Sequence, residues 1–447
     1  MINHSSLTLA AFLCAAPLAA QTLPPVRPIG ATAARSTEVM GSVSTAVGLP
    51  GGRVLVNDIL KRRVLLFDST LTEVIVVADS TSSTANAYGG RTGGLLAYRG
   101  DSALFVDPAS LSMLVIAPAG NITRVMSAPR PEDVSSLIGG PNGSPGFDTS
   151  GRLVYRQPVR PRMAASPSGR PMPEFPDSVP VVRFDLASRT LDTVAFYGVQ
   201  KPNMRITETA TGAMSITSST NPLPVVDDWA LLSDGTVAIV RGKDYSIDWI
   251  APDGTRSSSG KIPYEWQRLD DEGKAALLDS ARAELEKARE RAMARMEGRG
   301  VAPMVVGGGG GGGAPDVMII TRGAAGGAPP ARGGGATPGR GAAPAGGAAF
   351  QMPPINMVNA DELPDYRPPF TAGAARGDLD GNLWVRTTSP VGNEGPIYFI
   401  IDKQGQVIDR VQLPAGRLVV GFGKGGDVFM ALRDADENAR VERARIR

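Results

Sequence analysis

The sequence predicts an all-β protein, a six-bladed β-propeller of four-stranded blades. Three observations lead to this fold. A tight turn followed by a short apolar strand recurs six times along the chain. A second β-rich segment follows each copy and a third follows most of them, with Gly, Asp and Asn at the joins, as hairpins require. A four-stranded meander of this kind buries both of its faces only when copies of it stack around an axis.

The repeated unit starts at a turn and runs into the second strand of each blade. A short apolar run precedes each copy and supplies the inner strand, although the runs before Gly151 and Gly381 are weaker. The six copies are Gly52–Asp58, Asp101–Asp107, Gly151–Arg156, Gly235–Arg241, Gly381–Arg386 and Gly426–Arg433.

The last blade lacks an outer strand after Ile446. We expect the segment Leu23–Ala33 to supply it, so that the two ends of the chain pair and close the ring. Closure of this kind removes the open sheet edges between the first and last blades. A β-sandwich with additional strands is the alternative, because short and evenly spaced strands also suit sandwiches.

An insertion interrupts the repeat at residues 265–369, between the fourth and fifth blades. Its first part, at about residues 270–297, is predicted to be a surface helix. Most of its circumference is charged, and one narrow apolar stripe recurs at helical spacing. The stripe consists of Leu277, Leu278, Ala281, Leu285 and Ala288. Gly, Ala and Pro dominate from about 299 to 350, where we expect a disordered loop because nothing there repays the entropy of ordering.

Residues 1–20 are expected to be a cleaved signal peptide, so that the propeller occupies residues 21–447. The apolar run Leu7–Ala20 ends in small residues before Gln21. A buried N-terminal helix is the alternative. A lipoprotein is not expected, because Leu13 occupies the position before Cys14 where a small residue is needed. We therefore expect export to the periplasm or the outside of the cell, with no transmembrane segment after cleavage.

Cleavage would remove His4 and Cys14, the single histidine and the single cysteine of the chain. The mature protein would then lack an imidazole base, a thiol nucleophile and any His- or Cys-ligated zinc site. The formal net charge is +2, and no segment concentrates Lys and Arg. We therefore expect no nucleic-acid partner, and we expect a monomer.

The second strand of each propeller blade ends on the face that also carries the loops between blades. The repeats therefore place a ring of charged residues around one central mouth, where we predict that a small anionic ligand or a protein partner binds. Arg suits such a site because its fork of donors matches carboxylate and phosphate groups. The alternative is that Arg and Asp of neighbouring blades pair and lock the ring. The ring consists of Asp58, Asp107, Arg156, Asp228, Arg241, Arg386 and Arg433.

Two of these repeats, Ser233–Arg241 and Asp378–Arg386, resemble NHL repeats. Three further segments resemble exported six-bladed β-propeller proteins of environmental bacteria, and the resemblance extends over nearly the whole mature chain. They are Asp227–Ala230, Ile262–Trp266 and Asp361–Phe370. The resemblance implies a fold and a compartment. It implies no reaction, because that family has no assigned general activity.

Two kinds of catalytic propeller are similar enough to compare. Streptogramin lyase-like propellers use a histidine, which the mature chain would lack. Gluconolactonase-like propellers hold a divalent cation with carboxylates and an asparagine, but their ligand motif does not match this chain residue by residue. We predict no cofactor; if a cation such as calcium bound, its candidate oxygen ligands would be Asp58, Asp107, Asp148 and Asp228.

The sequence thus favours a non-catalytic exported propeller that binds a ligand or partner. Two alternatives stay open. One is a divalent-metal-dependent hydrolase of the gluconolactonase type, in which a bound ion would activate water without histidine. The other is a structural module of a cell-surface assembly, tethered by the insertion.

Overall fold

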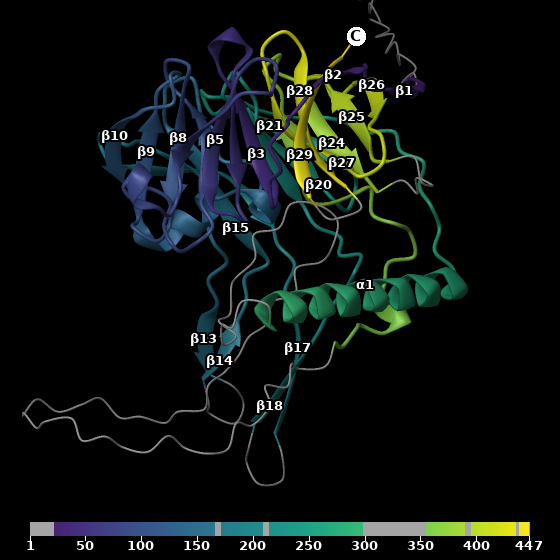
Figure 1. Ribbon diagram of the computed structural model, residues 1–447. Helices are drawn as coiled ribbons and strands as arrows, with labels where there is room; N and C mark the ends of the chain where they lie inside the picture. The colour runs from purple at the N-terminus through teal and green to yellow at the C-terminus, as the bar shows by residue number, and fades with distance from the viewer. Residues whose placement is uncertain are drawn as a thin grey trace, which may run out of the picture.

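The computed structural model describes residues 22–165, 171–208, 214–297, 355–388, 395–434 and 438–446. Within these residues, six blade sheets form a ring, five of them with four strands and one with a fifth strand added to its four (Figure 1). The predicted six-bladed β-propeller is therefore confirmed. The expected signal peptide and the expected Gly-rich loop lie outside the described residues.

Blades 1 to 3 each run as an antiparallel meander from an inner to an outer strand. Blade 1 consists of β3 (Val43–Gly48), β4 (Val54–Asp58), β5 (Arg63–Phe67) and β6 (Val74–Ala78). Blade 2 consists of β7 (Gly94–Tyr98), β8 (Ser102–Asp107), β9 (Ser112–Ile116) and β10 (Ile122–Ser127). Blade 3 consists of β11 (Gly146–Phe147), β12 (Leu153–Arg156), β15 (Ser178–Phe184) and β16 (Leu191–Gly198).

Blades 4 to 6 follow the same plan, and the predicted repeat falls on the second strand of every blade. Blade 4 consists of β19 (Asp228–Leu231), β20 (Val237–Arg241), β21 (Ser246–Ile250) and β22 (Arg256–Ser258). Blade 5 contains β23 (Phe370–Gly377), β24 (Leu383–Thr387), β25 (Ile397–Ile401) and β26 (Val407–Gln412). Blade 6 contains β27 (Arg417–Phe422), β28 (Asp427–Arg433) and β29 (Ala439–Arg445).

Apolar side chains between neighbouring blades form the core. One buried cluster joins Leu232 and Val240 of blade 4 to Phe370, Val385 and Phe399 of blade 5. Each blade is too thin to bury both faces alone, so its stability comes from stacking against the next blade. The tryptophans Trp229, Trp249 and Trp384 lie in this core, as their positions in strands predict.

The N-terminal segment closes the ring. β2 (Thr32–Arg35) pairs antiparallel with β29 and becomes the outer strand of blade 6. β1 (Val26–Pro28) pairs parallel with β26 and adds a fifth strand to blade 5. The expected closure by the N-terminal segment is therefore confirmed, although the strand that completes blade 6 begins only at the end of the predicted range.

A buried carboxylate locks this closure. Glu442 on β29 is fully buried, and its oxygens accept hydrogen bonds from Arg35 Nε at 2.7 Å and Arg417 Nε at 2.6 Å. Arg35 belongs to β2 and Arg417 to β27, so one side chain ties the N-terminal strand to the inner strand of the same blade. Burial alone would raise the pKa of Glu442, but the hydrogen bonds from Arg417 and Arg35 outweigh it and lower this pKa.

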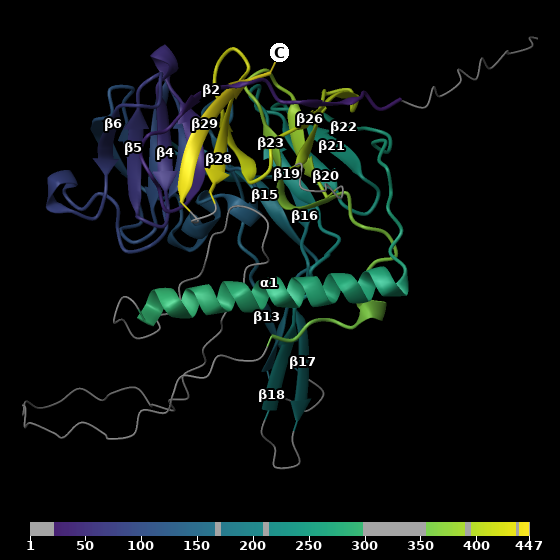
Figure 2. The ribbon, with the colours of Figure 1, turned by 45° about the vertical axis from the view of Figure 1, so that its right-hand side comes forward.

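Three insertions leave the propeller from the same face. In an antiparallel meander, the connection between the second and third strands and the connection between blades lie at the same end of the sheet. Figures 1 and 2 accordingly show all three below the blades. They are the hairpin β13 (Arg162–Ala165) with β14 (Pro171–Glu174), the hairpin β17 (Asn203–Glu208) with β18 (Met214–Ser219), and the helix α1 (Asp271–Glu297). The sequence predicted the helix but neither hairpin.

Helix α1 has the predicted character. Asp270 caps it, because its Oδ1 accepts the Gly273 N–H at 2.8 Å. Leu285, on the apolar stripe, is buried. Lys274 donates to Asp365 at 2.7 Å and so ties the helix to the returning chain. Among the described residues, no helix is both long and apolar enough to cross a membrane.

Short 3-10 helices complete the connections. They are η1 (Pro50–Gly52), η2 (Ser82–Thr84), η3 (Pro131–Leu137), η4 (Gly140–Asn142) and η5 (Ala360–Glu362).

Replacing Glu442 with Gln tests the closure. We expect the free energy of unfolding at neutral pH to fall by about 3 kcal/mol, because a buried ion pair loses its carboxylate while both arginines stay. Folding lowers the pKa of Glu442, so the stability that it contributes is present above the ordinary glutamate pKa and is lost as the pH falls through the folded value. The difference between wild type and variant, measured by urea denaturation, should therefore shrink in acid.

The matched control is Asp101→Asn, which removes an exposed ion pair with Lys424. Its cost should be below about 1 kcal/mol. A Glu442→Gln cost as small as that of the control would contradict the role given to this carboxylate.

Candidate functional site

The face that carries the insertions also carries the predicted ring of charged residues. Five of the seven residues end the second strand of their blade, Arg386 lies one residue before the end of β24, and Asp228 begins β19. The structure therefore places all seven at the expected end of their blades. Their surroundings, however, divide them into two groups.

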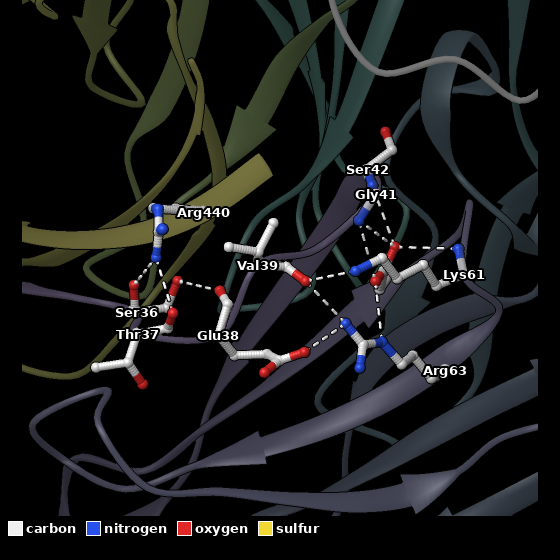
Figure 3. Close-up of polar contacts among 10 residues, drawn as sticks. Ser36, Thr37, Glu38, Val39, Gly41, Ser42, Lys61, Arg63 and Arg440 are labelled. Carbon is white, nitrogen blue, oxygen red and sulfur yellow. Dashed lines mark hydrogen bonds and ion pairs between the residues drawn. The ribbon is translucent and has the colours of Figure 1, made fainter. Parts of the chain in front are cut away.

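The carboxylates of Asp58 and Asp107 cap turns of their own blades. Gly41, Ser42, Lys61 and Arg63 converge on one point (Figure 3). There the Asp58 carboxylate accepts the Ser42 N–H at 3.1 Å and the Arg63 Nε–H at 3.1 Å, together with the N–H groups of Gly41 and Lys61. Both of its oxygens are thus occupied by the protein itself.

Asp107 plays the same part in blade 2. Its carboxylate accepts the N–H groups of Ala109 and Ser110 at 3.1 and 3.2 Å and the Ser110 hydroxyl at 2.5 Å. The carboxylate at the end of the second strand is therefore a turn-capping residue in blades 1 and 2.

Arg241 is also committed to structural contacts. Its guanidinium donates to Asp227 at 2.7 Å and to Asp248 at 2.8 Å, and both partners belong to the same region of blade 4. Arg433 lies exposed at the end of β28. The alternative of structural pairing thus describes Arg241, although its partners come from its own blade rather than from the ring.

The four candidate metal ligands do not come together. Asp148 lies in the turn between β11 and β12, at the opposite end of its blade from Arg156, where it pairs with Arg152 at 2.9 Å. Within the described ranges, no three Asp, Glu, His or Cys side chains are arranged to hold a metal ion.

The short helix η4 lies at the centre of the insertion-bearing face. It belongs to the loop between blades 2 and 3, yet it contacts β23, the inner strand of blade 5. A Cβ atom on Gly373 would lie 2.8 Å from the Gly140 carbonyl oxygen, and Gly373 has a φ of 75°, so glycine is required there. The Trp229 indole N–H donates to the Asn142 carbonyl at 2.8 Å. Blades 3, 4 and 5 thus meet around η4.

Arg156 is buried beside η4 with part of its guanidinium unpaired. Its exposed fraction is 8%, its Nη2 donates to the Asn142 side chain, and its guanidinium carbon lies 5.5 Å from the centre of the Tyr197 ring. Within the described chain, its buried Nε–H has no hydrogen-bond acceptor. Burial lowers the pKa of Arg156, and the nearby Tyr197 and Asp228 only partly offset that effect.

Asp228 is the nearest carboxylate, but the backbone occupies its oxygens. It is fully buried, and it accepts the N–H groups of Trp229 at 2.9 Å and Ala375 at 2.8 Å. Burial raises the pKa of Asp228 to about 7, although these N–H groups and Arg376 lower it. The carboxylate therefore neutralises the surrounding guanidiniums only in part.

Two further arginines, Arg376 and Arg386, come from blade 5. Arg376 on β23 lies opposite Trp384 on β24, and Arg386 follows two residues later, so both guanidiniums leave the same side of the sheet. The Arg376 side chain is partly buried, and in the part of the chain that the structure describes no hydrogen bond or ion pair reaches its guanidinium. Arg386 contacts the Thr371 hydroxyl at 3.4 Å, which is a weak interaction.

The electrostatics of this pair are unfavourable in the free protein. Burial lowers the pKa of Arg376, and the Arg386 guanidinium lowers it further, while Tyr398 and Asp228 act in the opposite direction. We name Arg156, Arg376 and Arg386 the central arginine cluster. Asp228 interacts electrostatically with Arg156 and Arg376, and Arg376 interacts with Arg386. Within the described chain these guanidiniums keep vacant donors, and an incoming anion would stabilise them.

No family model matches this chain, and no curated protein matches it in sequence.

Solved structures resemble the chain in fold. A gluconolactonase from Xanthomonas campestris has 11% sequence identity and a TM-score of 0.37, with coverage of 96% of this chain and 99% of its own. Regucalcin from Agrobacterium tumefaciens, a calcium-binding protein, has 12% identity and a TM-score of 0.34, with coverage of 94% and 98%. Virginiamycin B lyase from Staphylococcus aureus has 10% identity and a TM-score of 0.32, with coverage of 91% and 85%.

The pH dependence of stability tests the environment of Asp228. Folding raises its pKa from 3.8 to about 7, so its burial is favoured while it is protonated and costs free energy as the pH rises through this window. The free energy of unfolding of wild type should therefore fall by about 3 kcal/mol between pH 4 and pH 7, relative to Asp228→Asn. Urea denaturation of both proteins at a series of pH values measures this difference. A difference that does not change with pH would show that the carboxylate is solvated.

Proposed function

We propose that this protein is a ligand-binding β-propeller, and that a small carboxylate or phosphate anion binds to the central arginine cluster. The observation that carries the proposal is Arg376, a partly buried guanidinium whose pKa burial lowers and whose donors form no hydrogen bond or ion pair with the described residues. A charge that is partly removed from water costs free energy unless a ligand compensates it. A binding site explains why the fold would carry such a cost.

Two further features support an anion as the ligand. The Arg156 Nε–H is a second buried donor without an acceptor in the described chain, and Arg386 has one weak contact at 3.4 Å. Guanidinium groups bind carboxylates and phosphates through paired N–H donors, and such charge-assisted bonds are roughly twice as strong as neutral ones.

The same geometry favours binding over catalysis. Asp228 is the one titratable carboxyl group of the cluster, and its oxygens are fully buried against backbone N–H groups. It is placed to balance charge rather than to exchange a proton with a ligand. The apolar run Leu7–Ala20 supports export, so we propose that the ligand is a solute met outside the cytoplasm.

A binding experiment with Arg376→Met tests the proposal. We expect one or more of citrate, malonate, lactate and phosphate to raise the melting temperature of wild type and to bind in calorimetry. The variant should bind that anion at least about tenfold more weakly, because a charge-assisted pair contributes about 1.5–3 kcal/mol. Its melting temperature without ligand should be unchanged or higher, since a partly buried charge without a hydrogen-bond acceptor is gone.

The control is Arg124→Gln, which removes an exposed arginine from the outer strand β10 and should leave binding intact. The proposal is wrong if no anion stabilises wild type, or if Arg376→Met destabilises the free protein and binds the anion as before. Stabilisation by calcium alone would instead favour the metal-dependent hydrolase.

A further inference from the structure

The outer edges of the six blades differ in whether another strand covers them. β1 covers the edge of blade 5 by pairing with β26, and β2 completes blade 6. Blades 1 to 4 end in β6, β10, β16 and β22, and no strand of the described chain pairs with the outer side of any of these. An open edge presents unpaired N–H and C=O groups that will accept another strand.

The open edge of blade 1 is the most apolar of the four. β6 reads Val-Ile-Val-Val-Ala, and it contains no charged residue and no proline. Val74, Ile75 and Val76 have exposed fractions of 37%, 60% and 42%, so three consecutive β-branched side chains face solvent. Figure 2 shows β6 at the rim of the ring, away from the insertions.

The other three open edges carry the features that prevent strand pairing. β10 contains the exposed Arg124, β16 contains the exposed Asp192, and β22 is three residues long and begins with Arg256. Charged side chains and short length are the usual means by which proteins protect an edge strand. Such protection is missing from β6.

We propose that β6 pairs antiparallel with β6 of a second copy of this chain, so that two propellers share one eight-stranded sheet. A strand can pair with its own copy about a two-fold axis, which gives a closed dimer rather than a fibre. The chain already adds a strand to a blade edge through β1, which pairs in parallel with β26, so the rim of a blade can accept an additional strand. From the sequence we expected a monomer, and the β6 edge leads to the opposite proposal.

A register centred on Ile75 fits this pairing. It sets Ile75 opposite Ile75 and Val74 opposite Val76, and cross-strand pairs of β-branched residues stabilise sheets. The nearest charged residue on one side, Glu73, then lies opposite Val77 of the other copy, so no like charges face each other. Pairing with β5 is regular over Val74–Val76, and the bulge lies beyond them at Val77.

Sedimentation velocity across about 1–200 µM tests the dimer, since an interface of a few residues implies a micromolar dissociation constant. Wild type should pass from monomer to dimer within this range. Ile75→Lys places a charge on the two-fold axis and should raise the dissociation constant at least tenfold, with an unchanged melting temperature at low concentration.

The matched control is Val125→Lys, at an equally exposed position on β10 (64% exposed), and it should dimerise as wild type does. Two results would overturn the proposal. One is a monomeric wild type at the highest concentration, and the other is a dimer that Ile75→Lys leaves intact. The site lies on a different edge from the central arginine cluster, so Arg376→Met should dimerise normally whatever its anion affinity.

Discussion

Closure of the ring by the N-terminal strand is the interaction on which the rest of the structure depends. A propeller blade buries its faces against its two neighbours, so an open ring would expose two apolar faces at once. β2 and β29 close it by pairing residues more than 400 positions apart, and the buried Glu442 joins Arg35 and Arg417 across that pairing. Stacking of all six blades is therefore coupled to one long-range contact.

A closed ring brings distant segments of the chain to one centre. The connection between blades 2 and 3 reaches the inner strand of blade 5 through η4, and Asp228 of blade 4 accepts an N–H from Ala375 of blade 5. Arg156, Arg376 and Arg386 thereby share one environment although they lie on two blades and are far apart in sequence. The Asn142 side chain holds the Arg156 guanidinium, and that reduces the entropic cost of binding a ligand through this residue.

The repeats predicted the blades because each second strand is a short apolar run that follows a tight turn. The repeats also placed Asp58, Asp107 and Arg156 at the same end of their blades, but that position does not determine which residues they contact. Asp58 and Asp107 are followed by residues whose N–H groups they cap, whereas Arg156 meets η4, which comes from another blade. That contact is long-range and no local pattern encodes it.

Arg376 was missed for a related reason. It lies on β23, which is rich in Ala and Gly, so the sequence showed only a weak apolar run there and gave no register for Arg376. The pairing of β23 with β24 is also interrupted between Phe370 and Ala375. The hairpin β13–β14 was missed because Arg162–Ala165 and Pro171–Glu174 lack an apolar alternation, so these two strands depend on pairing with each other.

The central claim is that the arginine cluster is completed by an anion, and a crystal structure grown with a small dicarboxylate tests it most directly. We predict a bound carboxylate within hydrogen-bond distance of the Arg376 and Arg386 guanidiniums and of Arg156 Nε. A structure in which these donors are satisfied by protein groups or water, with the dicarboxylate bound elsewhere or not at all, would contradict the claim.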